Sequence, residues 1–204
     1  MSQLELVAVL EKSQLLGHIG PGGIDEHLKH ARAQLRAANP TSDSRWCDLG
    51  AGGGLPGLVI GHDRPDLHMV LLDRSTTKTD FLEQAIRGLG LQKHVEVLHG
   101  DAAAIAHQVV HRGAYDGVLS RSFGSPATTA ECASGLLRVG GRLVASEPPR
   151  QCQQRWHPQA LNSMGFSEPN FLDGPPRFVS ISLRKAPPSG LPRKWTQIRK
   201  DPMF

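Results

Sequence analysis

The feature that most constrains the fold is a glycine-rich stretch at residues 46–57, WCDLGAGGGLPG, in which a short run ending in an aspartate precedes five glycines. Glycine loses more conformational freedom on folding than any other residue, so this density is costly unless the backbone turns tightly or approaches something closely. The pattern predicts a strand that ends near Asp48, then a ligand-binding loop, then a helix that begins within 55–61. The alternative is a tight strand-to-helix turn that binds nothing.

From Trp46 onward, short apolar runs alternate with segments of helical periodicity. This alternation is typical of strands that pair in parallel, with helices crossing back between them. It predicts an α/β fold with a doubly wound sheet, in which the glycine pair Gly140-Gly141 ends a helix. The expected strands are 68–73, 95–101, 115–122 and 142–147, and the expected helices are 77–91 and 126–141.

The pattern changes after the last of these strands. A helix-like segment at 158–166 is followed by two apolar segments, 169–173 and 177–185, which a Gly-Pro-Pro turn joins. Two strands so close in sequence form a hairpin, so the last strand is expected to be antiparallel. A mostly parallel sheet with a C-terminal antiparallel hairpin resembles the Rossmann-like sheet of class I methyltransferases, which use S-adenosylmethionine.

We expect three regions along the chain. Two amphipathic helices are predicted over 4–16 and 24–38, and glycine-rich turns separate them from each other. The end of the chain is rich in proline and basic residues, so its structure is expected to be partly irregular. The three regions are a short helical N-terminal extension (1–44), a methyltransferase domain (45–185) and a basic tail (186–204).

Charge and composition limit the partners. The formal net charge of +4 permits an anionic partner such as RNA without demanding one. No apolar run approaches the roughly 20 residues of a membrane span, and the first residues lack the features of a signal peptide, so we expect a cytoplasmic protein without a membrane partner. Cys47, Cys132 and Cys152 are widely spaced, and His27 and His30 are expected to be solvated, so no metal site is predicted.

The ligand of the glycine loop is indicated by two aspartates. Residues 52–57 satisfy G-x-G-x-x-G, which alone is weak evidence for a dinucleotide, and no G-x-x-x-x-G-K-[ST] phosphate loop is present. Asp48 directly precedes the glycines, where a carboxylate would repel phosphates and suit a cofactor that carries positive charge. Asp73 ends the next expected strand, where it accepts hydrogen bonds from ribose hydroxyls or, alternatively, caps the following helix.

The sequence motifs around this loop indicate a protein family more specifically. The segment DLGAGGGLPG at 48–57 resembles the motif of the glucose-inhibited division protein B family, the methyltransferases that modify the seven-position nitrogen of a guanine in small-subunit ribosomal RNA. The Leu-Pro-Gly ending is the distinctive part. Further matches follow in order: LLD at 71–73, YDGVLSRSF at 115–123, GLLRVGGRL at 135–143, and in the tail PRKW followed by RKDP.

This resemblance implies S-adenosylmethionine as the cofactor, and ribosomal RNA or the small ribosomal subunit as the partner. It implies that Asp73 holds the ribose, that Asp101 and Ala102 lie at the adenine, and that Arg121 lies at the methionine end or the target base. For Arg121 the alternative is a surface arginine after a strand. The expected cofactor-binding residues are Asp48, Gly50, Gly52, Leu55, Asp73, Asp101, Ala102 and Arg121.

Arg121, Phe123, Arg193 and Lys194 are the expected substrate-binding residues. Phe123 is a candidate platform on which an unpaired target base stacks, with packing in the core as the equal alternative. Arg193 and Lys194 lie beside Trp195 in the basic tail, where they are expected to contact RNA. The alternative for this segment is a solvated terminus.

The sequence departs from the family after the fifth strand, where relatives usually read Leu-Lys-Gly and this chain reads ASEPPR. Glu147 stands at or beside the lysine position, and a carboxylate there is unfavourable for phosphate binding. This leaves a second hypothesis, a methyltransferase of the same fold that acts on a small molecule. A third is a non-catalytic nucleotide-binding module or a nicotinamide-dependent reductase.

No catalytic side chain is expected for a ring-nitrogen acceptor. The seven-position nitrogen of guanine has a free lone pair and no proton to lose, so the protein contributes positioning and electrostatic tuning. An oxygen acceptor would instead need a base. His99 and Glu147 are the candidates near strand ends, and both are expected to be structural.

Overall fold

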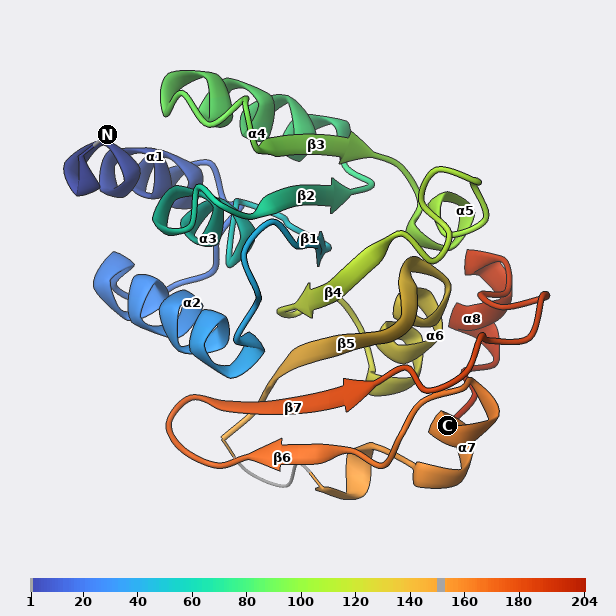
Figure 1. The fold of residues 1–204 in the computed structure, drawn as a ribbon. Coiled ribbons are helices and arrows are strands. Elements are labelled where there is room, and N and C mark those ends of the chain that lie inside the picture. The colour runs from blue at the N-terminus through green and yellow to red at the C-terminus, as the bar shows by residue number, and fades with distance from the viewer. Residues whose placement is uncertain (1, 150–152) are drawn as a thin grey trace.

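The structure is a computed structural model and describes residues 2–149 and 153–204 (Figure 1). Its centre is one seven-stranded sheet with the order β3-β2-β1-β4-β5-β7-β6. The first five strands in this order pair in parallel, whereas β7 is antiparallel to both β5 and β6. The predicted fold class is confirmed. The strands are β1 (Arg45–Leu49), β2 (His68–Asp73), β3 (Val95–His99), β4 (Tyr115–Ser120), β5 (Leu137–Glu147), β6 (Asn170–Leu172) and β7 (Arg177–Ser182).

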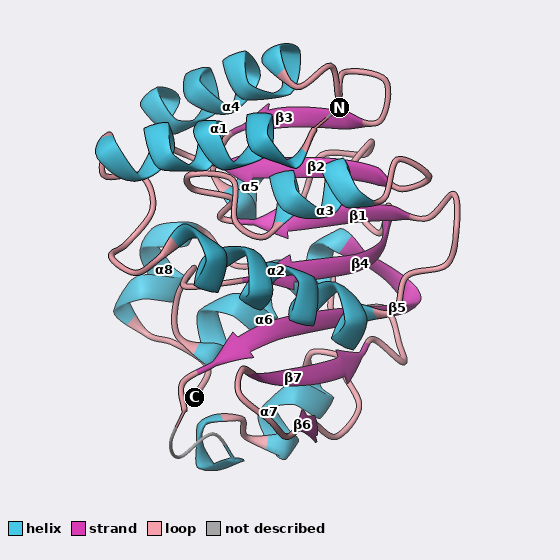
Figure 2. Ribbon diagram, turned by 90° about the vertical axis from the view of Figure 1, so that its left-hand side faces the viewer, coloured by secondary structure: helices cyan, strands magenta, loops and turns pink. Residues whose placement is uncertain are grey.

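Helices cover both faces of the sheet, and α1 to α4 share one face (Figure 2). Each face has its own apolar core, because side chains alternate between the faces along each strand. In β1, Trp46 packs toward α1–α4, whereas Cys47 packs toward α5, α6 and the C-terminal segment. The helices are α1 (Gln3–Leu15), α2 (Ile24–Ala38), α3 (Gly57–Asp63), α4 (Thr76–Gly88), α5 (Ala102–Ile105), α6 (Pro126–Leu136), α7 (Pro158–Ser163) and α8 (Trp195–Lys200).

The two N-terminal helices are part of the packed structure. Leu6 and Leu10 of α1 and Leu28 of α2 are buried in the same core as the strands. The buried amide of Gln34 donates hydrogen bonds to the carbonyls of Ser120 and Val144, at 3.1 and 3.0 Å. The helical extension therefore fastens the ends of β4 and β5 to the face that it covers. In the described part of the chain, no helix is long and apolar enough to cross a membrane.

The largest error in an expected boundary is at the end of the helix predicted over 126–141. This helix ends at Leu136, and β5 begins at Leu137, five residues before the expected start. The pairing of β4 with β5 is irregular there, and Gly140 has a φ of +89°. A Cβ on Gly141 would lie 2.9 Å from the carbonyl oxygen of Asp116. The glycine pair therefore serves a bulge and a close backbone approach inside a strand, and it does not end a helix.

Candidate functional site

A cavity of about 420 Å³ opens at the carboxyl ends of β1 to β4. Parallel sheets bind ligands at this edge, in the crevice where the strand order reverses. Here the reversal lies between β1 and β4. Seven of the eight expected cofactor-binding residues line the cavity; Asp48 does not. The lining also includes residues that the sequence did not indicate: His18 to Pro21 and His27 from the N-terminal extension, and Trp195 from the tail.

The glycine loop has the close approaches that its composition predicts. Gly50, Gly52 and Gly54 all have positive φ, which side chains rarely tolerate. A Cβ on Gly53 would lie 2.3 Å from the hydroxyl oxygen of Ser13, and that hydroxyl donates a hydrogen bond to the Gly53 carbonyl at 2.9 Å. The loop therefore lies directly against the end of α1, with its other side open to the cavity.

Asp73 joins the glycine loop to the segment that precedes α4. Its Oδ2 accepts a hydrogen bond from the Gly52 N–H at 2.8 Å, and its Oδ1 accepts one from the Ser75 N–H at 2.9 Å. Ser75 is the residue before α4, so Asp73 holds the start of that helix as well as the glycine loop. A carboxylate has about four lone-pair sites, so capacity remains for a ligand hydroxyl.

Asp101 follows β3 and holds the start of the next helix, α5. It is the N-cap of α5, and its Oδ1 accepts a hydrogen bond from the Ala104 N–H at 3.0 Å. Asp101 and Ala102 both line the cavity. His99, considered as a base, is exposed at the end of β3, where its Nε2 lies 3.3 Å from the hydroxyl of Thr76. It does not line the cavity.

Asp48 lies beneath the loop. Its side chain is completely buried, its Oδ2 accepts a hydrogen bond from the Gly57 N–H at 2.7 Å, and its Oδ1 has no hydrogen-bond partner among the described residues. Burial raises the pKa of this carboxyl to about 7, against the opposing effects of the Gly57 hydrogen bond and Arg121. Asp48 therefore holds the start of α3, and any effect on a ligand passes through the loop or through its charge.

Arg121 has a specific, half-buried environment, unlike a solvated surface arginine. Its Nη2 donates to Nδ1 of His27 at 2.9 Å, and His27 Nε2 lies 3.2 Å from the carbonyl of Gly20. This fits the neutral imidazole that carries its proton on Nε2. The Arg121 Nη1 is buried without a partner in the part of the chain that is described. Such a guanidinium nitrogen beside a cavity is suited to an anionic ligand group.

The expectation that His27 and His30 are solvated is wrong. His27 is only 7% exposed, and it holds Arg121 as described above. His30 Nε2 lies 2.9 Å from the hydroxyl of Ser146, and burial lowers the pKa of His30 to about 4. The two histidines share the inner face of α2, one turn apart. The three-residue spacing of the two histidines in an amphipathic helix indicates that they share one face. It does not reveal whether that face is buried.

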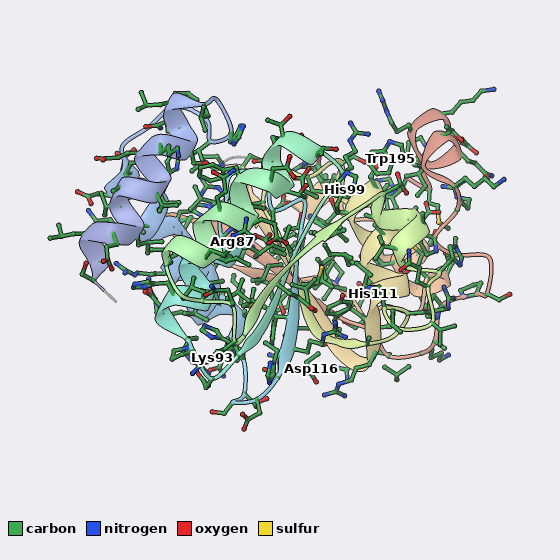
Figure 3. The ribbon with its side chains drawn as sticks, turned by 90° about the horizontal axis from the view of Figure 1, so that it is seen from above. Arg87, Lys93, His99, His111, Asp116 and Trp195 are labelled. Carbon is green, nitrogen blue, oxygen red and sulfur yellow. The ribbon has the colours of Figure 1, made fainter. Side chains whose placement is uncertain are left out.

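Phe123 and, from the tail, Trp195 form an aromatic wall of the cavity. A Cβ on Gly50 would lie 2.6 Å from the Phe123 ring, and the rings of Phe123 and Trp195 are 5.8 Å apart. The guanidinium of Arg74 lies over the Trp195 ring at 5.3 Å. In Figure 2, α8 lies on the left, at the edge toward which the parallel strands point, and Figure 3 labels Trp195 on the C-terminal segment.

Arg193 is engaged inside the protein. Its Nε and Nη2 donate to the two carboxylate oxygens of Glu131 at 2.8 and 2.7 Å, and its backbone N–H donates to the same carboxylate. Glu131 is completely buried in α6, so this ion pair fastens the tail to the fold. The guanidinium expected to contact RNA is thus occupied, whereas Lys194, Arg199 and Lys200 are exposed. The available signal in the sequence was a glutamate inside the apolar stretch 126–136, because a buried glutamate needs a positively charged side chain to pair with it.

Glu147 lines a second cavity of about 320 Å³ beyond the ends of β4 and β5. Its side chain is 2% exposed, and its Oε2 accepts a hydrogen bond from Arg155 Nη1 at 2.9 Å. Burial raises the pKa of this carboxyl, and the indole of Trp156 and the charge of Arg155 oppose the rise. The expected conflict between Glu147 and RNA phosphates is therefore reduced, because the carboxylate is paired within the fold.

Among the residues described, no group of three His, Cys, Asp or Glu side chains could hold a metal ion. The family profile described as rRNA small subunit methyltransferase G matches residues 13–161, more than half of the chain. This chain belongs to that family. The predicted family and the predicted class of enzyme, a methyltransferase, are thereby confirmed.

Individual relatives agree. The ribosomal RNA small subunit methyltransferase G of Mycolicibacterium gilvum is 33% identical over 73% of this chain and 67% of its own length. That of Rubrobacter xylanophilus is 40% identical over 59% of this chain, but the match spans only 46% of its own length. A solved structure from Agrobacterium tumefaciens, described as a predicted O-methyltransferase, superposes with a TM-score of 0.58 at 19% identity, over 74% of this chain and 79% of that one. The last similarity concerns the fold alone.

Proposed function

We propose that this protein transfers a methyl group from S-adenosylmethionine to a ring nitrogen of a guanine in small-subunit ribosomal RNA. The observation that carries the proposal is the single cavity on which the glycine loop, Asp73 and Asp101 converge from the ends of three neighbouring strands. Family membership supplies the class of acceptor, because the matched relatives are named for small-subunit ribosomal RNA.

The residues of the cavity fit the groups of this cofactor. Two carboxylates, Asp73 and Asp101, line it and can accept hydrogen bonds from hydroxyl and amino groups. The Nη1 of Arg121, which has no partner among the described residues, suits the carboxylate of the methionine part. When bound, S-adenosylmethionine supplies an electrophilic methyl group. Asp73 would hold its ribose, Asp101 and Ala102 its adenine, and Gly50 and Leu55 the methionine end.

The work of the protein in this reaction is to position the two reactants. The seven-position nitrogen of guanine attacks with its own lone pair, so no side chain has to remove a proton. Phe123 lines both cavities, which supports a role for its ring as the platform on which an extruded base stacks. Holding the acceptor in line with the donor is worth up to roughly 7–11 kcal/mol.

The proposed partner is RNA of the small ribosomal subunit, which implies a cytoplasmic protein. Lys194, Arg199 and Lys200 are exposed on the segment that carries Trp195, at the carboxyl edge of the sheet. Their charges are suited to the RNA backbone, and such contacts weaken as the salt concentration rises. Arg193 is left out of this set because Glu131 holds it.

Two measurements test the proposal in sequence. Isothermal calorimetry should detect S-adenosylhomocysteine binding but no NAD binding; the reverse result would favour the reductase. Purified 30S subunits that lack the modification are then incubated with enzyme and labelled S-adenosylmethionine, with 50S subunits as the control. We expect label in the RNA of 30S subunits alone. Cofactor binding without any RNA labelling would favour a small-molecule acceptor.

A further inference from the structure

The second cavity is adjacent to the first, and the two share Ser122 and Phe123. It lies beyond the ends of β4 and β5. Its lining includes one nine-tenths-buried acid, Glu147, together with its partner Arg155 and the buried Trp156. A cavity that adjoins the donor site through one aromatic residue is where the acceptor has to enter.

We propose that the Glu147–Arg155 pair recognises the Watson–Crick edge of the acceptor guanine. This inference rests on the proposed function. Along that edge guanine presents two donors, the two-position amino group and the N1–H, followed by one acceptor, O6. A carboxylate beside a guanidinium presents two acceptors followed by donors, which is the complementary order.

The same pair rejects the other purine. Adenine has an acceptor at N1 and an amino donor at position six, so its N1 lone pair would face the Glu147 carboxylate and its amino group would face Arg155. A site built to hydrogen-bond particular groups discriminates strongly against an analogue that leaves its buried polar groups unpaired. Glu147 thus selects guanine, although the same residue is unfavourable for phosphate.

The orientation that results is productive. The seven-position nitrogen lies on the opposite side of the purine from N1 and the two-position amino group. A guanine held by Glu147 at its Watson–Crick edge therefore presents that nitrogen away from Glu147. Phe123, which lines both cavities, offers its ring to the face of the base.

Unused hydrogen-bonding capacity in the cavity supports a ligand there. The Arg155 hydrogen bond occupies one of about four lone-pair sites on the carboxylate. The indole of Trp156 lies near the same carboxylate and opposes the rise in its pKa. The remaining lone-pair sites of Glu147 are available to a group that enters the cavity.

The test compares Glu147→Gln with Glu168→Gln, an exposed glutamate that serves as the matched control. Methyl transfer to 30S subunits is measured as kcat/KM, and S-adenosylhomocysteine affinity and the melting temperature are measured on the same preparations. We expect E147Q to lower kcat/KM by about 10- to 100-fold, because the amide opposes the guanine donors with a donor of its own. Cofactor affinity should not change, and E168Q should match the wild type.

Each outcome decides the inference. A wild type that labels 30S RNA and an E147Q variant that labels it equally well would overturn the role of Glu147 and leave the proposed function intact. A wild type that binds the cofactor and labels no RNA would overturn both. If E147Q does not fold, Arg155→Lys takes its place, because Arg155 is partly exposed and lysine keeps the charge. R155K should lower kcat/KM for 30S subunits, and unchanged kinetics would contradict the pairing.

Discussion

The loops after β1, β2 and β3 and the loops after β4 and β5 hold their polar residues in different ways. After β1, β2 and β3, on the side where the methyl donor is proposed to bind, Asp48, Asp73 and Asp101 each accept a hydrogen bond from a backbone N–H of a nearby loop or helix. After β4 and β5, on the side where the methyl acceptor is proposed to bind, side chains pair with side chains: Arg121 with His27 and Glu147 with Arg155. The first arrangement depends on local sequence, and the second depends on residues that only the complete fold brings together.

This difference separates two kinds of constraint on the sequence. A loop that wraps a cofactor needs glycines at particular φ values and acids at particular strand ends, so few substitutions are compatible with the motif at 48–57. A side-chain pair can be exchanged for another with different charge, provided both partners change together. The glutamate at 147 is acceptable in this chain because Arg155 is opposite it.

The largest expected effect concerns the anchor of the tail. Arg193→Ala would leave Glu131 buried without its partner, so we expect a loss of about 3–5 kcal/mol in the free energy of unfolding, measured by urea titration. Arg199→Ala, an exposed arginine in the next turns, should change stability by no more than about 0.5 kcal/mol. Equal stability of the two variants would show that the tail is not part of the fold.

A smaller effect tests the donor side. Asp73→Ala removes the acceptor that orders the glycine loop and that would hold a ribose hydroxyl. We expect it to weaken S-adenosylhomocysteine binding by about 1–3 kcal/mol, measured by calorimetry. Asp80→Asn, on the exposed side of α4, is the matched control. If D73A binds as tightly as D80N, the ribose has been assigned to the wrong residue.

The tail can also be tested as a wall of the cofactor cavity. Trp195→Ala removes a ring that lies against Phe123 and Arg74, so cofactor affinity should fall by about 1 kcal/mol, whereas Trp195→Phe should retain most of it. Trp46 and Trp156 are buried, so cofactor binding should alter the fluorescence of the wild type chiefly through Trp195. A W195A variant with unchanged affinity would return Trp195 to the RNA-binding surface.

The smallest effect is a pH dependence of stability at Asp48. The folded protein raises the pKa of this carboxyl from 3.8 to about 7, so its favourable contribution is present below about pH 4 and is lost as the pH rises through 7. Asp48→Asn removes the buried charge but weakens the hydrogen bond to Gly57, so at pH 8 we expect a net gain of about 1 kcal/mol. Melting curves at pH 4 and pH 8 should show this gain only at pH 8. An equal difference at both values would mean that Asp48 does not titrate in this range.

Sequence reasoning succeeded where local pattern controls structure. The strand–loop–helix order, the antiparallel hairpin and the convergence of Asp73 and Asp101 follow from periodicity and from the geometry of parallel sheets. It failed where long-range contacts decide. Nothing in the sequence around Arg193 reveals that Glu131, far away in the chain, will be buried beneath it, and no local pattern distinguishes the bulge at Gly140-Gly141 from a helix end.

The most direct test of the account is nucleoside analysis by mass spectrometry of RNA from unmodified 30S subunits after incubation with the enzyme and S-adenosylmethionine. We expect 7-methylguanosine to appear, at no more than one per subunit, and S-adenosylhomocysteine to suppress its formation. An enzyme that binds the cofactor but forms no methylated nucleoside, or that methylates a base other than guanine, would contradict it.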